Sequence, residues 1–419
     1  MARCIIIGGG HAGAQACISL RKEGWTDEIV LISDEHSLPY HRPPLSKNYL
    51  LGQVDEKGLL IRPEQAYQKD NITLKLRTRV ARIEPALQSV VLQNGERLSY
   101  DHLLLCTGSR ARKITCSGSE LNNVFYIKTL KDIEQLATRL STDKQRILMV
   151  GGGYIGLETA AVLNKMGHQI TLLEQAPRLL ARVTAPFISE FYQQLHQQQG
   201  VDIHTNTQVL AFTGEQTVTG VRCKTLTQLD APEQYFNADL VIVGIGAEIN
   251  TELAEQAGLL VEQNGIVVNE LCQTTDKNIY AAGDCTIGIE HHSGIATRIE
   301  SVPNALAQAK TAAATICGKH QAVTSSVPWF WSDQYDCKIQ IAGLNHGYDN
   351  TVLRQHSSNS FSLWYLKQGR IIAADCINTA KDFMAAKKII DKKISLPIDM
   401  IGNTDIDLIK QLSGRSQAI

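Results

Sequence analysis

The sequence predicts an α/β fold in which two parallel βαβ domains precede a smaller α+β domain. Three observations lead to this prediction. A glycine-rich motif that directly follows an apolar strand occurs twice, as CIIIGGGHAGAQA from Cys4 and as MVGGGYIGLETA from Met149. The chain has 419 residues, which is more than one hydrophobic core usually supports. After the polar stretch GKHQAVTSS, short β runs replace the alternation of strands and helices.

Composition and charge exclude several classes of protein. The 41 basic and 42 acidic residues give a net charge of -1, so no global field attracts the chain to nucleic acid or to a membrane surface. An apolar strand begins within four residues of Met1, which leaves no space for a secretion signal, and no apolar run reaches the roughly 18 residues of a membrane-spanning helix. The ten cysteines include no Cys-x-x-Cys pair, so we expect no metal site. These features predict a cytoplasmic protein, and we expect a monomer.

The first motif has the spacing of a dinucleotide-binding turn. It follows the apolar strand RCIII and opens an alanine-rich helix, HAGAQACISLRKEG. The first glycine permits a tight turn, the second lets a pyrophosphate approach the backbone, and the third allows the helix to pack closely on the strand. The next strand, EIVLISDE, ends in two acids 21 and 22 positions after the third glycine, where a carboxylate can bind the adenosine ribose. The residues of this predicted site are Gly8, Gly10, Gly13, Ala14, Asp34 and Glu35.

The second motif repeats every element of the first. The strand RILMV leads into three glycines with the same spacing, and the strand HQITLLE ends in Glu174, 18 positions after the third glycine. A carboxylate there accepts hydrogen bonds from a ribose 2′-hydroxyl and repels a 2′-phosphate, which favours NADH over NADPH. Arg178 and Arg182 follow closely and leave a 2′-phosphate site open as the alternative. The residues of this predicted site are Gly151, Gly153, Gly156, Glu174 and Arg182.

Two dinucleotide sites in one chain indicate a flavin that is held permanently and a nicotinamide nucleotide that is exchanged. The strands that end at Thr107 and at Gly246 mark the places where the chain crosses between the two domains. Asp284 ends the strand NIYAAGD, where an acid can bind a flavin ribityl hydroxyl. We therefore expect an FAD-binding domain at 1–114 and 246–325, an inserted NAD-binding domain at 115–245, and a C-terminal α+β domain at 326–419.

Several blocks of sequence occur in an order that resembles one known family. They are LPYHRPPLSK, CTGSRAR, APRLLARVTAP, NIYAAGDC, RIESVPNALAQA and PWFWSDQY, in addition to the two glycine motifs. Over essentially the whole chain they resemble the ferredoxin reductases of bacterial oxygenase systems. The resemblance implies the glutathione-reductase-like fold, a noncovalent FAD and NADH as the electron donor. It also implies a [2Fe-2S] ferredoxin as the acceptor, which supplies a haem monooxygenase or a ring dioxygenase.

The resemblance further implies roles for individual residues. Lys47 and Glu158 resemble the family's pair beside the flavin ring, where a cation stabilises the charge that arrives with a hydride and a carboxylate accepts the nicotinamide carboxamide N–H. The alternative is that Lys47 is a solvated loop residue and Glu158 lies on a helix surface. Trp331 resembles the aromatic residue near the isoalloxazine, and its alternative is core packing with Trp329 and Phe330. The other residues that resemble FAD contacts are Arg42, Val80, Thr107, Arg110, Asp284 and Val302.

The mechanism that we expect is hydride transfer from NADH to the flavin, across a stack held by Ile155, Glu158 and Gly246. Other proteins on this scaffold pass electrons through a Cys-x-x-x-x-Cys pair or a single redox cysteine, but the segment 39–52 contains no cysteine. The electrons therefore leave directly from the flavin to a one-electron carrier. We expect this carrier to dock on a local basic patch near Arg298 and Lys310.

Other functions stay open at this point. Rubredoxin reductases and monodehydroascorbate-type reductases share these motifs, and an apoptosis-inducing-factor-like protein with this fold would act as a redox-sensing interaction partner. His291 and His292 form a pair that could bind a metal, but Glu290 is the only acid near them in their loop. We expect both to be exposed loop histidines.

Overall fold

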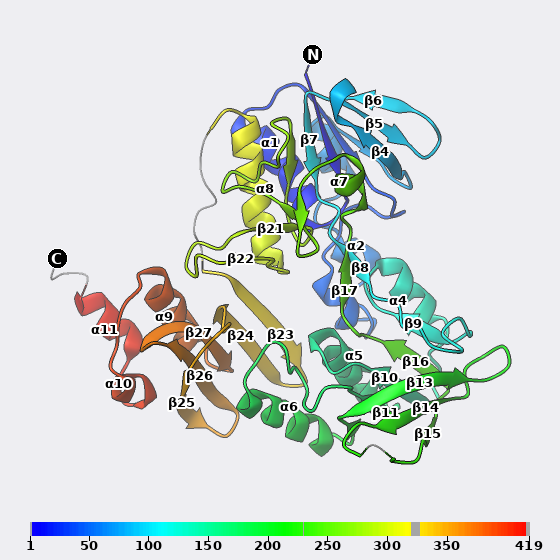
Figure 1. Ribbon diagram of the computed structural model, residues 1–419, viewed down its shortest axis with the longest axis vertical. Coiled ribbons are helices and arrows are strands. Elements are labelled where there is room, and N and C mark those ends of the chain that lie inside the picture. Colours follow the sequence, from blue (N-terminus) through cyan, green and yellow to red (C-terminus); the bar gives the residue numbers. More distant parts are fainter. Residues whose placement is uncertain (1, 229, 320–326, 416–419) are drawn as a thin grey trace.

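The structure, a computed structural model, describes residues 2–228, 230–319 and 327–415. Its elements form three lobes (Figure 1), with the first βαβ unit at the top, the second at the lower right and the C-terminal strands at the lower left. In the described part of the chain, two five-stranded parallel sheets and one five-stranded antiparallel sheet form the centres of these lobes. The predicted fold class, two Rossmann-like domains and a C-terminal α+β domain, is confirmed.

The first parallel sheet carries the first glycine-rich loop. Cys4 and Ile6 pack with α1 (His11–Glu23) and α8 (Val302–Ile316), whereas Ile5 and Ile7 pack with a three-stranded antiparallel sheet. Successive side chains of a strand point to opposite faces, so one strand serves both hydrophobic clusters. The sheet has the order β20 (Ile279–Ala281), β7 (His102–Leu105), β1 (Arg3–Ile7), β2 (Glu28–Ile32) and β3 (Ile72–Lys75), and the antiparallel sheet consists of β4 (Val80–Glu84), β5 (Ser89–Leu92) and β6 (Arg97–Ser99).

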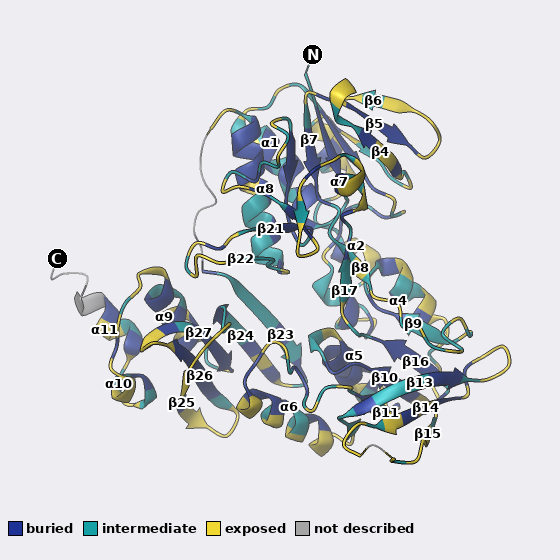
Figure 2. Ribbon diagram, in the orientation of Figure 1, coloured by how far each residue is buried: buried dark blue, intermediate teal, exposed yellow. Residues whose placement is uncertain are grey.

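The second parallel sheet repeats this architecture around the second glycine-rich loop. Ile147 and Met149 pack with α4 (Leu130–Ala137), α5 (Tyr154–Lys165) and α6 (Pro186–Gln198), whereas alternate residues pack with another three-stranded antiparallel sheet. The two halves therefore have the same layers, and Figure 2 shows that buried residues follow the strands of both parallel sheets. The order is β12 (Asp202–His204), β11 (Gln169–Leu173), β10 (Arg146–Val150), β16 (Leu240–Val243) and β9 (Val124–Tyr126), and the antiparallel sheet consists of β13 (Thr207–Thr213), β14 (Gly220–Thr225) and β15 (Gln234–Asn237).

The chain crosses between these two domains twice, and the crossings pair with each other. β8 (Ser109–Ala111) and β17 (Ala247–Ile249) form an antiparallel ribbon. The strands of the second sheet and of its antiparallel cover lie between residues 124 and 243, inside the predicted range 115–245. The predicted boundary between residues 325 and 326 lies outside the described residues. The remaining elements of these domains are η1 (Pro43–Ser46), α2 (Glu56–Leu59), α3 (Glu64–Lys69), η2 (Pro85–Leu87), α7 (Glu252–Gln256), β18 (Val261–Glu262), β19 (Gly265–Val267), β21 (Thr286–Ile289) and β22 (Ala296–Thr297).

The C-terminal domain is an antiparallel sheet covered by helices, as predicted. It docks on the second domain through the buried phenol of Tyr365, which donates to Asp375 at 2.5 Å and accepts from the amide of Ala185 at 3.0 Å. Burial raises the pKa of Asp375 to about 6. Within the described ranges, every helix is too short or too polar to cross a lipid bilayer. The elements are β23 (Trp329–Gln334), β24 (Cys337–Gly343), β25 (Asn350–Ser357), β26 (Ser360–Lys367), β27 (Arg370–Ile377), α9 (Ala380–Asp391), α10 (Ile398–Gly402) and α11 (Leu408–Arg415), with the sheet order β23-β24-β27-β26-β25.

Candidate active site

The first glycine-rich loop has the geometry that a pyrophosphate requires. Gly8 has φ +119°, and a Cβ added there would lie 2.1 Å from the carbonyl oxygen of Cys106. A Cβ on Gly13 would lie 1.9 Å from the carbonyl oxygen of Gly8, so the close packing of α1 on β1 depends on glycine. Gly10 differs, because the nearest described atom to its added Cβ would be the Arg42 Nε, 3.9 Å away. Gly10 is the N-cap residue of α1, which has neither a side-chain cap nor an acid in its first turn, so its first amides are available to an anion.

The second glycine-rich loop reproduces this geometry. Gly151 has φ +105°, and its added Cβ would lie 2.4 Å from the carbonyl oxygen of Gly244. A Cβ on Gly156 would lie 2.3 Å from the carbonyl oxygen of Gly151. No described atom lies within 4 Å of a Cβ added to Gly153, the N-cap residue of α5, and this helix again lacks a side-chain cap. Both loops therefore fit a dinucleotide at the helix N-terminus.

The predicted ribose-binding acids follow β2 and β11. Glu174 accepts hydrogen bonds from the amides of Gly152 at 2.5 Å and Ala176 at 2.7 Å. Glu35 accepts from Tyr40 and Arg42, each at 2.5 Å, whereas Asp34 is exposed.

The two arginines that follow Glu174 differ in the number of hydrogen bonds that their guanidinium groups make within the protein. Arg178 donates to Ser189 and to two backbone carbonyls within its own segment, so its guanidinium is already engaged. Arg182 is exposed, and its guanidinium lies 3.5 Å from the position of a Cβ added to Gly246. Three of the five N–H donors of Arg178 are used in this way, so Arg182, which is also more exposed, offers more donors to a ligand phosphate.

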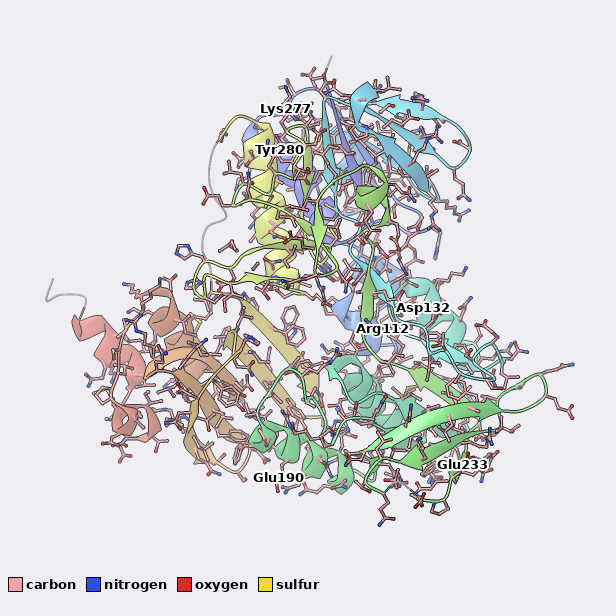
Figure 3. The ribbon with its side chains drawn as sticks, viewed as in Figure 1. Arg112, Asp132, Glu190, Glu233, Lys277 and Tyr280 are labelled. Atoms are coloured by element: carbon pink, nitrogen blue, oxygen red, sulfur yellow. The ribbon has the colours of Figure 1, made fainter. Side chains whose placement is uncertain are left out.

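A second group of charges surrounds the first glycine-rich loop. The Lys128 ammonium donates to Ser109 at 2.8 Å and lies 3.9 Å from Asp284, the predicted ribityl-binding acid. Burial lowers the pKa of Lys128 and raises the pKa of Asp284, because each charge is removed from water. Asp132, labelled in Figure 3 near the β8–β17 ribbon, holds this segment by accepting from the amide of Lys128 at 3.1 Å. Arg42 donates to the carbonyl of Lys128 at 3.1 Å, so both predicted FAD-contacting residues, Arg42 and Asp284, lie in one cluster.

All three domains meet at the carboxylate of Glu158. This side chain is buried in α5, and its Oε1 lies 2.9 Å from the Lys47 ammonium. Ser46 of η1 donates to Oε2 at 3.0 Å, and Ser332 of β23 donates to Oε1 at 2.6 Å. Burial raises the pKa of Glu158, and Lys47 and the two hydroxyls oppose that rise. Lys47 is therefore not a solvated loop residue, and Glu158 does not lie on a helix surface.

Comparison with known proteins agrees with this geometry. The family model described as pyridine nucleotide-disulphide oxidoreductase matches residues 2–309. The chain belongs to this family. A reductase C-terminal model matches residues 329–412.

The relatives identify the branch of the family. Putidaredoxin reductase of Pseudomonas putida is 43% identical over 96% of this chain and 95% of its own. A rubredoxin-NAD(+) reductase, also of Pseudomonas putida, is 35% identical over 90% of this chain and 96% of its own. The crystal structure of the covalent putidaredoxin reductase–putidaredoxin complex matches with a TM-score of 0.93, 41% identity and coverage of 99% and 98% of the two chains. The predicted resemblance to ferredoxin reductases, and with it the use of FAD and NADH, is confirmed.

Three further residues that were predicted to contact FAD, Val80, Thr107 and Val302, lie in different segments of the fold. Val80 begins β4, and the preceding segment is tied to the end of β2 because Thr78 donates its amide to the carbonyl of Ser33 at 2.8 Å. Thr107 donates to the carbonyl of Asn250 at 2.7 Å and so joins the two domain crossings. Val302 is the first residue of α8. These roles stay predictions.

Arg110, Trp331 and Ile155 lie at more open positions. Arg110 is exposed on β8 and donates to Glu252 at 2.6 Å, so its charge is already neutralised there. Trp331 is half-buried, and its ring centroid lies 5.4 Å from that of Trp329. Ile155 is 48% exposed at the start of α5, so its side chain is accessible to a ligand at the second glycine-rich loop.

Sequence reasoning missed four polar residues of the site and misjudged one histidine. His291 is exposed, as predicted, but the prediction for His292 was wrong because its side chain is only 9% exposed. Glu290 folds back over this loop and accepts from the ring of His292 at 2.9 Å, while Asp391 of α9 approaches from the C-terminal domain. The missed residues are Ser46, Lys128, Gln308, whose side chain accepts from the amide of Gly283, and Ser332. Ser46, Gln308 and Ser332 lie in blocks that carry the family resemblance, whereas Lys128 lies outside them, and residue spacing predicts a partner for none of the four.

Two alanine substitutions separate the two dinucleotide sites. We expect Gly10→Ala to lower the affinity for FAD about 10-fold to 100-fold. Gly153→Ala should lower the affinity for NADH by the same factor, while FAD stays bound. In each case the backbone permits alanine, but the methyl group occupies the space over the helix N-terminus. The flavin absorbance of the purified variants and titration with NADH measure the two affinities. A Gly153→Ala variant that loses FAD instead would contradict this assignment of the two loops.

Proposed function

We propose that the protein transfers electrons from NADH, through FAD, to a [2Fe-2S] ferredoxin that supplies a haem monooxygenase or a ring dioxygenase. FAD binds at the first glycine-rich loop and NADH at the second. The observation that carries the proposal is the buried ion pair of Lys47 and Glu158, which joins the two nucleotide-binding domains at 2.9 Å. We place this activity in the cytoplasm.

Thiol chemistry does not contribute to the proposed electron path. All ten cysteines lie in the described part of the chain, and all are free thiols. Cys106, which touches the first glycine-rich loop, is buried, and burial raises its pKa well above the usual range. A thiol in this state is a poor nucleophile, so the electrons leave directly from the flavin.

The ion pair has two distinct tasks in this reaction. Bound FAD supplies the chemistry, because it takes up a hydride and gives out electrons singly. The Lys47 ammonium stabilises the negative charge that develops with the hydride. Glu158 accepts the carboxamide N–H of the nicotinamide and so selects the face that it presents. Each charge also compensates the other, since an unpaired charge is costly at a buried position.

The preference for NADH depends on Glu174. We expect Glu174→Gln to lower the affinity for NADH about 10-fold. The difference in affinity between NADH and NADPH should become smaller, because the substitution removes the charge that repels a 2′-phosphate. Steady-state kinetics with both nucleotides measures the preference, and an unchanged FAD content shows that the fold is intact. An unchanged ratio of kcat/KM for the two nucleotides would mean that another residue selects the nucleotide.

The acceptor is tested with the purified flavoprotein. NADH should bleach its absorbance, and ferredoxin and rubredoxin panels then identify the carrier that reoxidises it rapidly. Slow reduction with a long-lived charge-transfer complex would favour the redox-sensing alternative. Of the two predicted docking residues, Lys310 is exposed, but Arg298 pairs with Glu300 at 2.8 Å and contributes less positive charge.

A further inference from the structure

A continuous chain of hydrogen bonds leads from Glu158 into the C-terminal domain. Ser332 donates to Glu158 at 2.6 Å, and the Gln334 side chain donates to the Ser332 hydroxyl at 3.2 Å. The ring Nε2 of His196, on α6, meets the Gln334 carbonyl oxygen at 2.8 Å. These three side chains are at most 1% exposed. Because β23 alternates its faces, Ser332 and Gln334 point to the same side as each other and away from Trp331.

The donors and acceptors in this chain have one consistent direction. The Gln334 amide nitrogen is used by Ser332, so its carbonyl oxygen needs a donor, and His196 provides one when its proton is on Nε2. Burial lowers the pKa of His196 to about 4, so the ring is neutral at neutral pH. The Ser332 hydroxyl receives the Gln334 hydrogen bond and directs its own proton to Glu158. Every proton in the chain therefore points toward the carboxylate.

We propose that Ser332 is a positioning residue for hydride transfer, which keeps the Glu158 carboxylate charged and oriented toward the nicotinamide. The inference rests on the proposed function, since it concerns the same carboxylate. Under this inference the C-terminal domain contributes a side chain to the nicotinamide site, because the Ser332 hydroxyl comes from β23. The site is complete only when this domain is seated on α5.

The groups around Glu158 make its charge depend on Ser332. Lys47 favours the carboxylate, but Asp333 lies 3.8 Å from the same ammonium and shares its charge. Tyr154 and Tyr192 are close enough to interact electrostatically with the carboxylate, and burial raises both phenol pKa values, so they remain neutral. Removing the Ser332 hydroxyl takes away a hydrogen bond to a charged group, which is worth more than a neutral one. The pKa of Glu158 then rises further.

The test is the pH dependence of two properties in the holoenzyme. For Ser332→Ala we expect the acid-side fall in hydride-transfer rate, followed by stopped-flow flavin absorbance, to move to higher pH by about one to two units. The affinity for NAD⁺, measured by calorimetry across the same pH range, should show the same displacement. Ser332→Thr keeps a hydroxyl and should restore the wild-type profile. If Ser332→Ala is not recovered folded, Gln334→Met removes the amide behind Ser332 and should give a smaller displacement in the same direction.

Ser362→Ala is the matched control. Ser362 lies in the same sheet, is fully buried, and donates to a buried carboxylate, that of Asp382, at 2.7 Å. Its loss should lower the stability of the domain without moving either pH profile. Profiles of Ser332→Ala and Gln334→Met that coincide with wild type would overturn the inference and leave Ser332 a packing role. A wild-type protein that NADH does not reduce would instead refute the proposed function.

Discussion

Replacing Glu158 with glutamine is expected to slow hydride transfer from NADH to FAD by about 100-fold while FAD stays bound. The amide fills the same volume, but Lys47, Ser46 and Ser332 then direct their donors at a group that is no longer charged. The nicotinamide also loses the charged acceptor that fixes its position, because the amide offers a single neutral carbonyl oxygen in its place. Stopped-flow measurement of flavin bleaching at saturating NADH gives the rate of this step.

Glu190→Gln provides the control for this substitution. Glu190, labelled in Figure 3, is exposed on α6 in the same domain, so the same change of charge occurs away from the junction. Its rate should equal that of the wild type. A Glu158→Gln variant as fast as Glu190→Gln would show that the ion pair serves the domain junction and not the reaction.

Replacing Arg354 with methionine is expected to destabilise the C-terminal domain by about 3–5 kcal/mol. The guanidinium is buried, lies 3.2 Å from Asp382, and donates to the backbone carbonyls of Ile401, Asn403 and Ile406. These bonds hold the segment of α10 and the turn that follows against β25. Methionine has a similar length, but it removes the guanidinium from the buried Asp382 carboxylate and leaves His356 and Ser362 as its side-chain partners.

Tryptophan fluorescence in urea reports on this domain, because three of the four tryptophans, at positions 329, 331 and 364, lie within it. Arg370→Met is the matched control, since Arg370 is exposed at the start of β27. Its unfolding midpoint should stay close to that of the wild type. Equal midpoints for the two variants would mean that the carbonyl contacts of Arg354 contribute little to stability.

Residue spacing was sufficient to locate both glycine-rich loops, the crossings at Thr107 and Gly246, and the acids that end β2 and β11. These features depend on the backbone of a few consecutive residues. The local periodicity of hydrophobic residues predicts the order of strand, turn and helix. The ion pair of Lys47 and Glu158 was foreseen only through the resemblance to a family, since 111 positions separate the two residues.

Only the tertiary structure decided what surrounds that pair. Glu158 receives hydrogen bonds from Ser46, 112 positions before it, and from Ser332, 174 positions after it. Both serines lie in blocks that carry the family resemblance, but nothing in the spacing of those blocks indicates that they share a partner. The His292 side chain is largely shielded from solvent for a comparable reason, because Glu290 contacts its ring and Asp391 approaches from another domain. Local sequence sets which backbone conformations are accessible, whereas burial and pairing depend on the segments that the fold places opposite a residue. The chain thus specifies its two nucleotide loops locally, but its active-site polarity arises where three domains pack together.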